Sequence, residues 1–318
     1  MSNGNNKSWS DRARKLVIDS IGHKTPWMIA KELKKRGLER HSTDAIKGII
    51  RRHKENPKKQ LHPKVKSNQP AISITSKVRI MYFDIESTDL SAGFGEMLSF
   101  GYWWHDEPEP HNINIYDYPG WDKLPVEQRD LYLMRDVAKL IEEADVLIGH
   151  YSTKFDTPFI QTRCIFHGLG PIPIPIQIDT WRISRYQLKL NNNRLKTIAK
   201  AFGCDEQKDE VPSNIWRRAK AHNLEAMKVI SAYNLQDVRT QRSITEKLMP
   251  IAKAMPNWNL LIDGTEARCP ACGSTKLHRR GFTHTKLYRY ERLRCADCGK
   301  WMRGRNSITP KDCQRVMH

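Results

Sequence analysis

An apolar stretch that ends in two carboxylates, residues 78–86, constrains the fold more than any other part of the chain. Its apolar side chains fall on both alternating faces, which is typical of a strand buried in the middle of a sheet. Asp84 and Glu86 are two residues apart, so their side chains point to the same side of that strand. Carboxylates this close repel each other unless a cation lies between them, and a hard divalent metal is the usual cation. The alternative is a strand that simply runs out into solvent, so the metal hypothesis needs further acids elsewhere in the chain.

The length and composition exclude several classes of protein. A chain of 318 residues can form one well-buried domain with smaller modules beside it. It has no apolar run of about 18 residues that could span a membrane, and its first residues lack the apolar core of a secretory signal. We therefore expect a cytoplasmic protein, in which the seven cysteines are metal ligands or free thiols rather than disulfides.

The net charge of +19 is concentrated at the two ends of the chain. Residues 1–69 contain 18 Lys and Arg against 6 Asp and Glu, and residues 264–318 contain 13 against 4. Residues 70–263 contain 23 against 25, a balance close to neutral. This distribution is typical of a protein whose ends hold a polyanion and whose middle acts on it. Basic tails that only aid solubility are the alternative, but both ends carry folding signals.

The basic N-terminal segment has the pattern of three short helices, with apolar residues at helical spacing and glycines where the first two helices end. The expected helices are residues 11–21, 27–36 and 43–53. The last helix presents Lys47, Arg51 and Arg52 on the side away from its apolar residues. This pattern predicts a helix-turn-helix-like domain over residues 1–54 that binds nucleic acid, with a protein-binding three-helix module as the alternative. Residues 55–77 mix Pro, Lys, Asn and Ser without periodicity and are predicted to be a basic linker.

The central segment alternates strand and helix patterns, as an α/β sheet of mixed direction requires. The expected strands are residues 78–86, 97–104, 113–118 and 146–149, and the expected helices include residues 129–144 and 224–248. Two further acids could join the first pair. Asp156 follows the last of these strands by a short loop and opens a helix, where it could simply be the N-cap. Tyr233 and Asp237 are four residues apart and share one face of the last helix, where an ordinary surface pair is the alternative.

Taken in order, three stretches resemble the three motifs of the DEDD exonuclease superfamily, the proofreading-exonuclease group with an RNase H-like fold. They are Phe83-Asp84-Ile85-Glu86, the segment from Gly149-His150 to Phe155-Asp156, and Tyr233-x-x-x-Asp237. The resemblance covers about residues 78–250. A tyrosine four residues before the last aspartate, with Ala232 where the other branch has histidine, is similar to the tyrosine branch of the superfamily. One departure is Tyr151, because family members often have Asn directly after the Gly-His pair, and it concerns how the substrate end is positioned.

This resemblance implies an RNase H-like domain over residues 78–262 that works as a metal-dependent 3′→5′ exonuclease. Two Mg²⁺ or Mn²⁺ ions about 4 Å apart would straddle the scissile phosphate, one lowering the pKa of the attacking water and the other stabilising the leaving 3′ oxygen. By the family pattern, Asp84 would bridge both ions. Glu86 and Asp237 would complete the first site, and Asp156 would support the second.

Other side chains around that site have roles implied by the same resemblance. Tyr233 would orient the attacking water, since a phenol with a pKa of about 10 is mostly protonated at neutral pH. Ser87 and Thr88 follow the first motif where relatives hold the terminal nucleotide, which makes them candidates for substrate binding. Asp179 is most simply a helix cap or a strand-end acid, so it is left outside the active set.

The C-terminal segment, residues 263–318, carries two Cys-x-x-Cys turns, each followed by glycine. The four cysteines are Cys269, Cys272, Cys295 and Cys298, with 22 residues between the pairs. This is the spacing of a tetrahedral structural Zn²⁺ site, and it resembles zinc ribbons. Paired disulfides are the alternative, which no secretory signal supports. Because so small a module buries little core, one zinc ion would supply its folding energy.

A predicted hairpin rich in Arg, Lys and Tyr lies between the two cysteine turns. Its candidate contacts to nucleic acid are Arg279, Arg280, Tyr288 and Arg289. Phosphate contacts combined with aromatic stacking suit single-stranded or junction nucleic acid. A ribbon that docks a protein partner is the rival interpretation.

The sequence thus predicts an α/β protein with an RNase H-like mixed sheet flanked by helices, a small N-terminal three-helix domain and a C-terminal zinc ribbon. The expected function is 3′→5′ exonuclease action on a single-stranded 3′ end, with DNA favoured over RNA because of the helix-turn-helix pattern. Two alternatives stay open: an RNA-trimming or structure-selective endonuclease on the same scaffold, and a catalytically inert regulator that binds nucleic acid. The combination of modules resembles proteins of phages or mobile elements.

Overall fold

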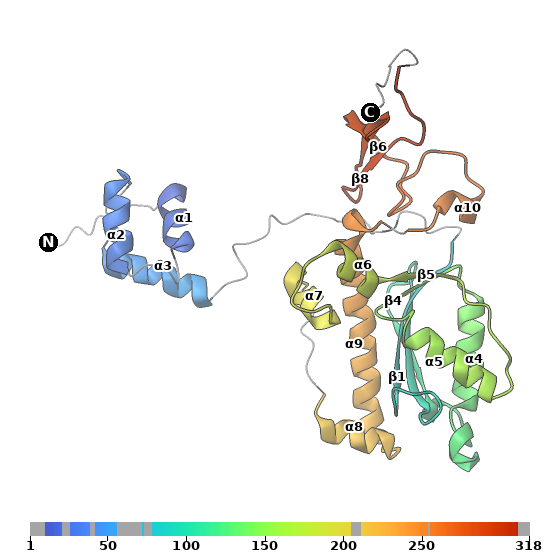
Figure 1. Ribbon diagram of the computed structural model, residues 1–318. Coiled ribbons are helices and arrows are strands. Elements are labelled where there is room, and N and C mark those ends of the chain that lie inside the picture. The colour runs from blue at the N-terminus through green and yellow to red at the C-terminus, as the bar shows by residue number, and fades with distance from the viewer. Residues whose placement is uncertain are drawn as a thin grey trace. The chain divides into compact units, whose positions relative to one another are not determined.

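The computed structural model describes residues 10–20, 26–38, 42–55, 72, 78–204, 211–253 and 255–310. The chain divides into two compact units, Met1–Lys66 and Ser67–His318 (Figure 1). Most of the predicted linker lies outside the described residues, as do the side chains of Arg51 and Arg52. Within the described part of the chain, no helix is long and apolar enough to cross a membrane.

The N-terminal unit contains three helices around a small apolar core. They are α1 (Asp11–Asp19), α2 (Pro26–Lys35) and α3 (Thr43–Glu55). Ser10 and Ser42 cap α1 and α3, because their hydroxyl oxygens accept hydrogen bonds from backbone N–H groups three residues later. The buried core consists of Ala13, Val17, Ile29, Leu33, Ile46 and Ile49. The three predicted helices are therefore present.

β1 (Ile80–Ser87) lies at the centre of a five-stranded sheet in the second unit. The strand order is β3-β2-β1-β4-β5, with β2 (Met97–Trp104), β3 (His111–Asn114), β4 (Val146–Gly149) and β5 (Ile176–Asp179). β1 is antiparallel to β2 and parallel to β4, so the sheet is mixed. This confirms the predicted fold class, a mixed α/β sheet flanked by helices.

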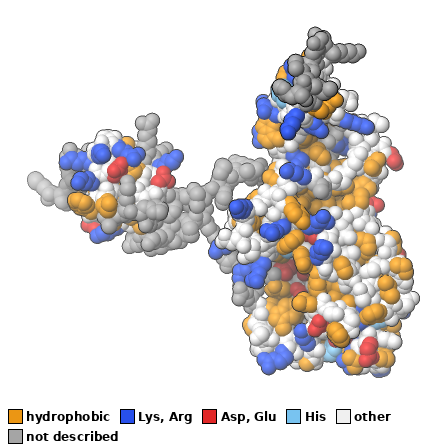
Figure 2. Space-filling view, in the orientation of Figure 1, with side chains coloured by type: hydrophobic (Ala, Val, Ile, Leu, Met, Phe, Trp, Pro, Cys, Tyr) orange, Lys and Arg blue, Asp and Glu red, His pale blue; other side chains and the backbone are white. Residues whose placement is uncertain are grey.

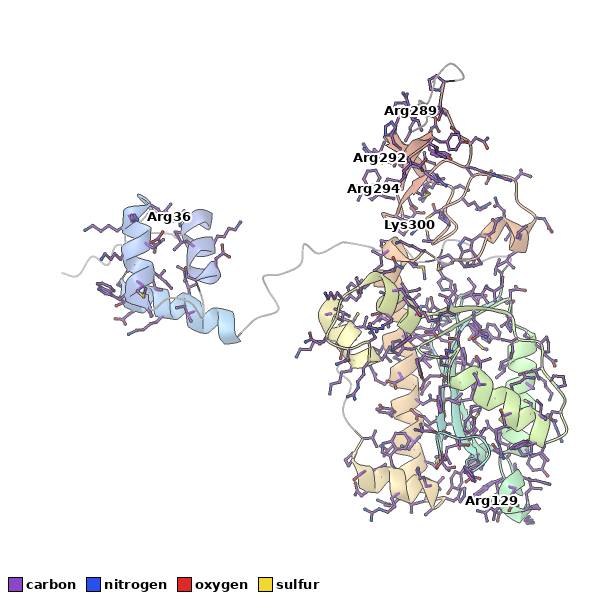
Figure 3. All side chains as sticks on the ribbon, viewed as in Figure 1. Arg36, Arg129, Arg289, Arg292, Arg294 and Lys300 are labelled. Carbon is purple, nitrogen blue, oxygen red and sulfur yellow. The ribbon has the colours of Figure 1, made fainter. Side chains whose placement is uncertain are left out.

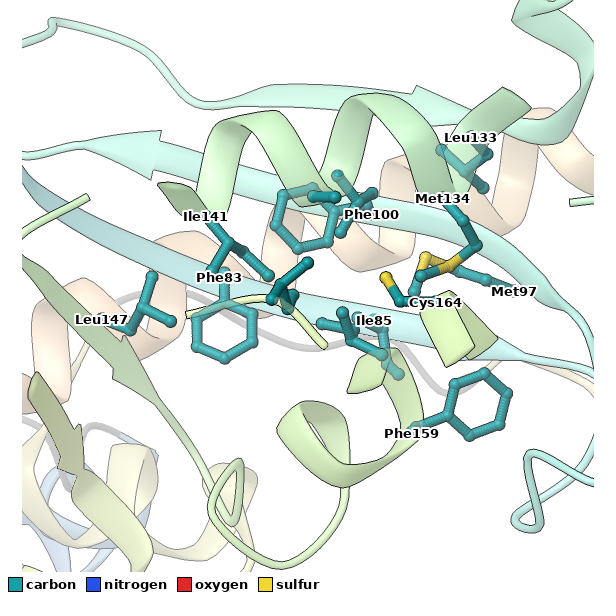
Figure 4. Packing of buried hydrophobic residues seen from close by; sticks show 14 of the residues in the cluster. Phe83, Ile85, Met97, Phe100, Leu133, Met134, Ile141, Leu147, Phe159 and Cys164 are labelled. Atoms are coloured by element: carbon teal, nitrogen blue, oxygen red, sulfur yellow. The ribbon is translucent and has the colours of Figure 1, made fainter. Parts of the chain in front are cut away.

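Helices cover both faces of this sheet (Figure 1). α4 (Leu131–Glu142) and α5 (Asp156–Phe166) cover the face that carries Phe83 and Ile85, where a large apolar core forms (Figure 4). α9 (Leu224–Leu248) crosses the other face, against β1 and β2. The helices beside α9 are α6 (Thr180–Gln187), α7 (Leu195–Phe202) and α8 (Ser213–Lys220). Because side chains alternate along β1, Asp84 and Glu86 face the side of the sheet where α9 lies.

The third strand differs from its prediction over residues 113–118, because β3 ends at Asn114. The chain then enters a 3-10 helix, η2 (Ile115–Asp117), closed by two reciprocal bonds. The Asn114 side chain accepts from the backbone N–H of Tyr116 (2.9 Å), and the Asp117 side chain accepts from the backbone N–H of Asn114 (2.8 Å). This local capping overrides the strand pattern. Further 3-10 helices are η3 (Trp121–Lys123), η4 (Val126–Gln128) and η5 (Met249–Ile251).

The C-terminal module packs against the central sheet. The short helix α10 (Trp258–Ile262) precedes the module, and its three strands, β6 (Leu277–His284), β7 (Arg289–Cys295) and β8 (Trp301–Arg303), form an antiparallel sheet. Cys272 and Cys295 share one buried cluster with Tyr82 of β1 and Ile148 of β4. Lys300 Nζ also donates a hydrogen bond to the carbonyl of Ala252. The module and the central sheet therefore share part of one core.

Candidate active site and cysteine cluster

Three acidic side chains that are far apart in the sequence meet at one point beside β1. Asp84 and Glu86 come from β1, and Asp237 comes from α9, where its carboxylate is buried. One carboxylate oxygen of each lies within 4.8 Å of the others. Three negative charges at this separation repel strongly, and oxygen donors of this kind are what Mg²⁺ and Mn²⁺ prefer. The donor set therefore fits a hard divalent cation.

Asp156 lies next to this cluster but outside its three members. It begins α5 and is only 3% exposed. The parallel pairing of β1 with β4 ends at Tyr82, so the backbone N–H of Ile85 needs another partner, and it donates to Asp156 Oδ1 (3.1 Å). Burial raises the pKa of Asp156 to about 7, the bond from Ile85 lowers it, and the charges of Asp179 and Asp237 raise it. Asp156 is not the N-cap of α5, because Phe155 occupies that position.

Asn234 is a polar side chain of the site that the sequence reasoning missed. It is fully buried on α9, and its Nδ2 donates to the Asp84 carboxylate (2.9 Å) and to the Asp84 backbone carbonyl (3.1 Å). Its Oδ1 accepts from Ser99 Oγ (3.0 Å) and from Asn112 Nδ2 (2.8 Å). Gly101 leaves room for the Asn234 side chain, since a Cβ at position 101 would lie 2.7 Å from Asn234 Oδ1. Asn234 therefore fixes the orientation of the Asp84 carboxylate.

A cleft of about 930 Å³ opens over the acidic cluster. Asp84, Tyr233 and Asp237 line it on one side. The other lining residues come from the loop after β4, from α6 and from the segment before and within α7: His150, Tyr151, Trp181, Arg185, Leu190, Asn191, Asn192, Asn193, Arg194, Leu195 and Lys196. The cleft thus combines three Arg and Lys side chains with three exposed or half-buried aromatic rings, beside carboxylates.

Tyr151 lies in the loop after β4, and its backbone is strained, with φ of 67°. A bulky residue rarely adopts this left-handed conformation, so neighbouring contacts must hold it there. Asp179 does so, because its carboxylate accepts from the backbone N–H of Tyr151 (3.0 Å) and from Thr153 Oγ1 (2.6 Å). The same carboxylate caps α6 by accepting from the backbone N–H of Trp181 (2.9 Å). The Tyr151 ring, 43% exposed, meets the Trp181 ring edge-on with centroids 5.0 Å apart.

His150 ties the asparagine-rich segment to this loop. Its Nε2 faces the backbone carbonyl of Asn193 and its Nδ1 faces Thr180 Oγ1, each at 2.9 Å. The hydroxyl of Thr180 in turn donates to the carbonyl of Gly149 (3.0 Å). These hydrogen bonds connect the asparagine-rich wall of the cleft to the end of β4.

Comparison with known families decides which group of proteins this is. The family model described as RNase H superfamily matches residues 81–249, more than half of the chain. The chain belongs to the RNase H superfamily. Membership supports nuclease activity and nucleic-acid binding in general, and the acidic cluster and the cleft both lie within the matched residues.

Beyond this RNase H superfamily match, the likenesses are weak. No curated protein matches the chain. Among solved structures, it is similar to the family B DNA polymerase from the hyperthermophilic archaeon Pyrobaculum calidifontis, with 20% sequence identity and a TM-score of 0.41. That match covers 54% of this chain and 25% of the polymerase, so this chain corresponds to about a quarter of it. A likeness of this strength does not bear on substrate or partners.

Three of the side chains predicted to contact substrate take part in local interactions. Ser87 Oγ donates to the backbone carbonyl of Asp89 (2.7 Å), and Thr88 Oγ1 accepts from the backbone N–H of Glu96 (2.9 Å), so both brace the turn after β1. Lys47 is exposed and pairs with Asp44 on the same helix (3.0 Å). Their contact with a substrate stays a prediction.

The four cysteines of the C-terminal module also come together. Their sulfur atoms lie within 4.8 Å of one another, and the pairs Cys269 with Cys298 and Cys272 with Cys295 are each 3.6 Å apart. A tetrahedral zinc site with Zn–S bonds of about 2.3 Å has sulfur edges of about 3.8 Å, whereas a disulfide needs about 2.05 Å. The glycines after each turn adopt φ of 73° and 78°.

Proposed function

We propose that this protein is a metal-dependent 3′→5′ exonuclease that hydrolyses phosphodiester bonds of nucleic acid, with DNA favoured over RNA. One observation carries the proposal: Asp84, Glu86 and Asp237 converge within 4.8 Å beside a cleft large enough for a nucleic-acid end. Such a set of carboxylates is the expected ligand set for two Mg²⁺ or Mn²⁺ ions. The tyrosine branch of the DEDD superfamily is the subgroup we assign, because Tyr233 lines the same cleft as Asp237.

In this proposal each residue has a separate task. Bound divalent ions activate water as a nucleophile and stabilise the negative charge on the leaving 3′ oxygen. Asp84, Glu86 and Asp237 would hold the ions, and Asp156 would add a fourth carboxylate through its position against β1. Tyr233 presents its hydroxyl to the attacking water. Its ring is held by an edge-on contact with Trp216, with centroids 5.9 Å apart.

The cleft supports a single-stranded 3′ end as substrate. Tyr151 and Trp181 offer aromatic surface on which an unpaired base can stack, and Arg185 and Arg194 offer positive charge for phosphates. A base inside a duplex has no exposed face, so a paired end must melt before it can use this surface. Tyr151 thereby replaces the Asn that related exonucleases often have after the Gly-His pair.

The other modules complete the proposal. Residues 1–54 act as a helix-turn-helix-like nucleic-acid-binding domain, with Lys47, Arg51 and Arg52 as its contacts, and residues 55–77 act as a basic linker. The exonuclease domain spans residues 78–262, and residues 263–318 form a zinc ribbon with one structural Zn²⁺. The spacing of the four sulfur atoms supports the zinc assignment.

The test is digestion of 5′-labelled single-stranded DNA and RNA, with Mg²⁺ or Mn²⁺ against EDTA. Wild type is expected to give products that shorten one nucleotide at a time from the 3′ end, and Asp237→Asn, which keeps the shape of the side chain, is expected to be inactive. Zinc content is measured in every sample, so that loss of activity in EDTA is not confused with loss of the ribbon. Cutting of a circular single strand would instead identify an endonuclease. If wild type and Asp237→Asn bound the strand equally well and neither cut it, the protein would be an inert regulator.

A further inference from the structure

One face of the three-stranded sheet in the C-terminal module collects basic and aromatic side chains. Across the sheet, Arg292 is opposite Arg303, Arg294 is opposite Trp301, and His278 is opposite Arg294. Residues opposite each other share a face, as do residues two apart along a strand. The set, called the basic face below, consists of His278, Tyr290, Arg292, Arg294, Trp301 and Arg303. Figure 2 shows Lys and Arg side chains gathered on this module.

The basic face is turned to solvent, and the other face is half-buried along β7 and β8. Along β7 and β8, Arg292, Arg294 and Arg303 are exposed, and Trp301 is 52% exposed. Between them, Leu293 and Met302 alternate to the other side, and Met302 packs against the core that contains the cysteines. The exposure of the basic face is therefore fixed by the packing of the module.

No carboxylate neutralises this face from within the three strands. Their single acid, Glu291, alternates to the opposite face and pairs there with Arg279 (3.3 Å). The opposite face also holds Arg289, whose guanidinium lies over the Phe282 ring (3.9 Å to the centroid). Arg279 and Arg289 thus have partners on the opposite face, whereas no acidic side chain of the three strands neutralises the basic face.

The guanidinium groups of the basic face are positioned by aromatic rings. Arg292 and Arg294 lie 5.2 and 5.8 Å from the Trp301 ring centroid, and Arg303 lies 4.2 Å from that of Tyr290. Arg292 and Arg294 project from the same side of the module in Figure 3. Such cation–π contacts restrict the side chains, so less conformational freedom is lost when a ligand binds.

We propose that this basic face binds single-stranded nucleic acid, with Arg292 and Arg294 on successive phosphates, Arg303 beside them on the neighbouring strand and Trp301 stacked on a base. Side chains two apart on a strand are about 6.7 Å apart, close to the spacing of phosphates on an extended single strand. Guanidinium groups match phosphate oxygens, and an exposed indole beside them matches an unpaired base. An acidic protein could pair with the arginines but would offer no base to stack on the Trp301 indole. A duplex would offer phosphates, but its bases are stacked on one another and cannot stack on the indole.

The test measures binding in the full-length chain carrying Asp237→Ala, so that nothing is cut. The probe is a fluorescent 12-nucleotide oligothymidylate, and its anisotropy is followed over a series of salt concentrations. Because each lost phosphate contact on a single strand lowers the salt slope by about 0.7, Arg292→Gln with Arg294→Gln is expected to lower it by about 1.4 and to weaken binding. The matched control, Arg135→Gln with Lys139→Gln, removes the same charge from the exposed side of α4 and is expected to bind within about twofold of the parent, because screening weakens longer-range attraction.

Trp301→Ala tests the stacking part separately. It is expected to weaken binding of the oligothymidylate by about tenfold and to weaken binding of an abasic oligomer of equal length by much less, since stacking needs a base. One zinc per chain and an unchanged melting temperature show that each variant is folded. An unchanged salt slope in the Arg292 and Arg294 variant, an equal loss in the control, or displacement of the probe by polyglutamate at lower concentration than by unlabelled oligomer would overturn the proposal. The outcome is independent of the proposed nuclease function, because every variant is inactive and only binding is read.

Discussion

Asn234→Ala is the perturbation that tests most directly how the acidic cluster is held together. The substitution removes both hydrogen bonds from Asn234 Nδ2 to Asp84 and the acceptor of the Ser99 hydroxyl. A hydrogen bond to a charged group is worth about 1.5–3 kcal/mol, and a buried polar group left without its partner costs about 1–3 kcal/mol. Asn112 keeps an acceptor, because its Nδ2 also donates to Ser99 Oγ (2.7 Å). We therefore expect a loss of roughly 3–5 kcal/mol in the free energy of unfolding.

The expected effect on activity follows from the orientation of the Asp84 carboxylate. Removal of a group that orients a metal ligand typically costs about 10–100-fold in metal affinity or activity. Asn234→Ala should therefore need about 10–100 times more Mn²⁺ for half-maximal cleavage of a single-stranded oligonucleotide. Raising the Mn²⁺ concentration should restore part of the rate, which a general loss of folding would not allow.

Val238→Ala provides the matched control. Val238 is fully buried one turn further along α9, and its side chain also packs beside Gly101. Its truncation should cost about 2 kcal/mol of stability without changing the metal requirement. Both variants are assayed below their melting temperatures. If Asn234→Ala and Val238→Ala had the same metal dependence as wild type, the role assigned to Asn234 would be wrong.

Three further predictions concern other parts of the molecule. Tyr151→Asn should keep or gain stability, because Asn tolerates the left-handed backbone. It should raise KM for a single-stranded oligonucleotide by about tenfold, because a base can no longer stack on the ring. An equal KM for wild type and variant would contradict base stacking at this position. Burial raises the pKa of Asp156 from 3.8 to about 7, so its contribution to stability is present below about pH 4 and is lost as the pH rises through 7. Melting curves should therefore show Mn²⁺ stabilising wild type more at pH 8 than at pH 5, and Asp156→Asn should reduce that difference; an unreduced difference would assign it to other groups. Cys272→Ser should lower the zinc content measured by atomic absorption below one ion per chain and should lower the melting temperature, whereas full zinc occupancy in this variant would exclude the four-cysteine site.

The parts of the fold that follow from local alternation could be predicted from the sequence. The apolar residues of β1 fall into two clusters on opposite faces, and the two acids two residues apart reach the same point beside α9. The spacing of the cysteine pairs likewise predicted that their four sulfur atoms meet. In each case a period of two, or a fixed turn, determines the position of the side chain without help from distant residues.

Other features depend on contacts that no local pattern contains. Asn234 could be placed on the face of α9 that carries Asp237, but an asparagine on a helix is commonly exposed, and only the close packing at Gly101 buries it. The two faces of the C-terminal sheet could not be predicted from the sequence either. A bulge between Arg279 and Phe282 inserts an extra residue into β6, so simple alternation assigns Phe282 to the wrong face.

The cluster in which Tyr82 and Ile148 of the five-stranded sheet meet Cys272 and Cys295 has a practical consequence for anyone who shortens this protein. A fragment that stops at residue 262 would expose the apolar side chains of β1 and β4 that the ribbon now covers, and such a patch favours aggregation. The central domain and the C-terminal module should accordingly be expressed together, and the soluble yields of the truncated and full-length chains would show the difference directly.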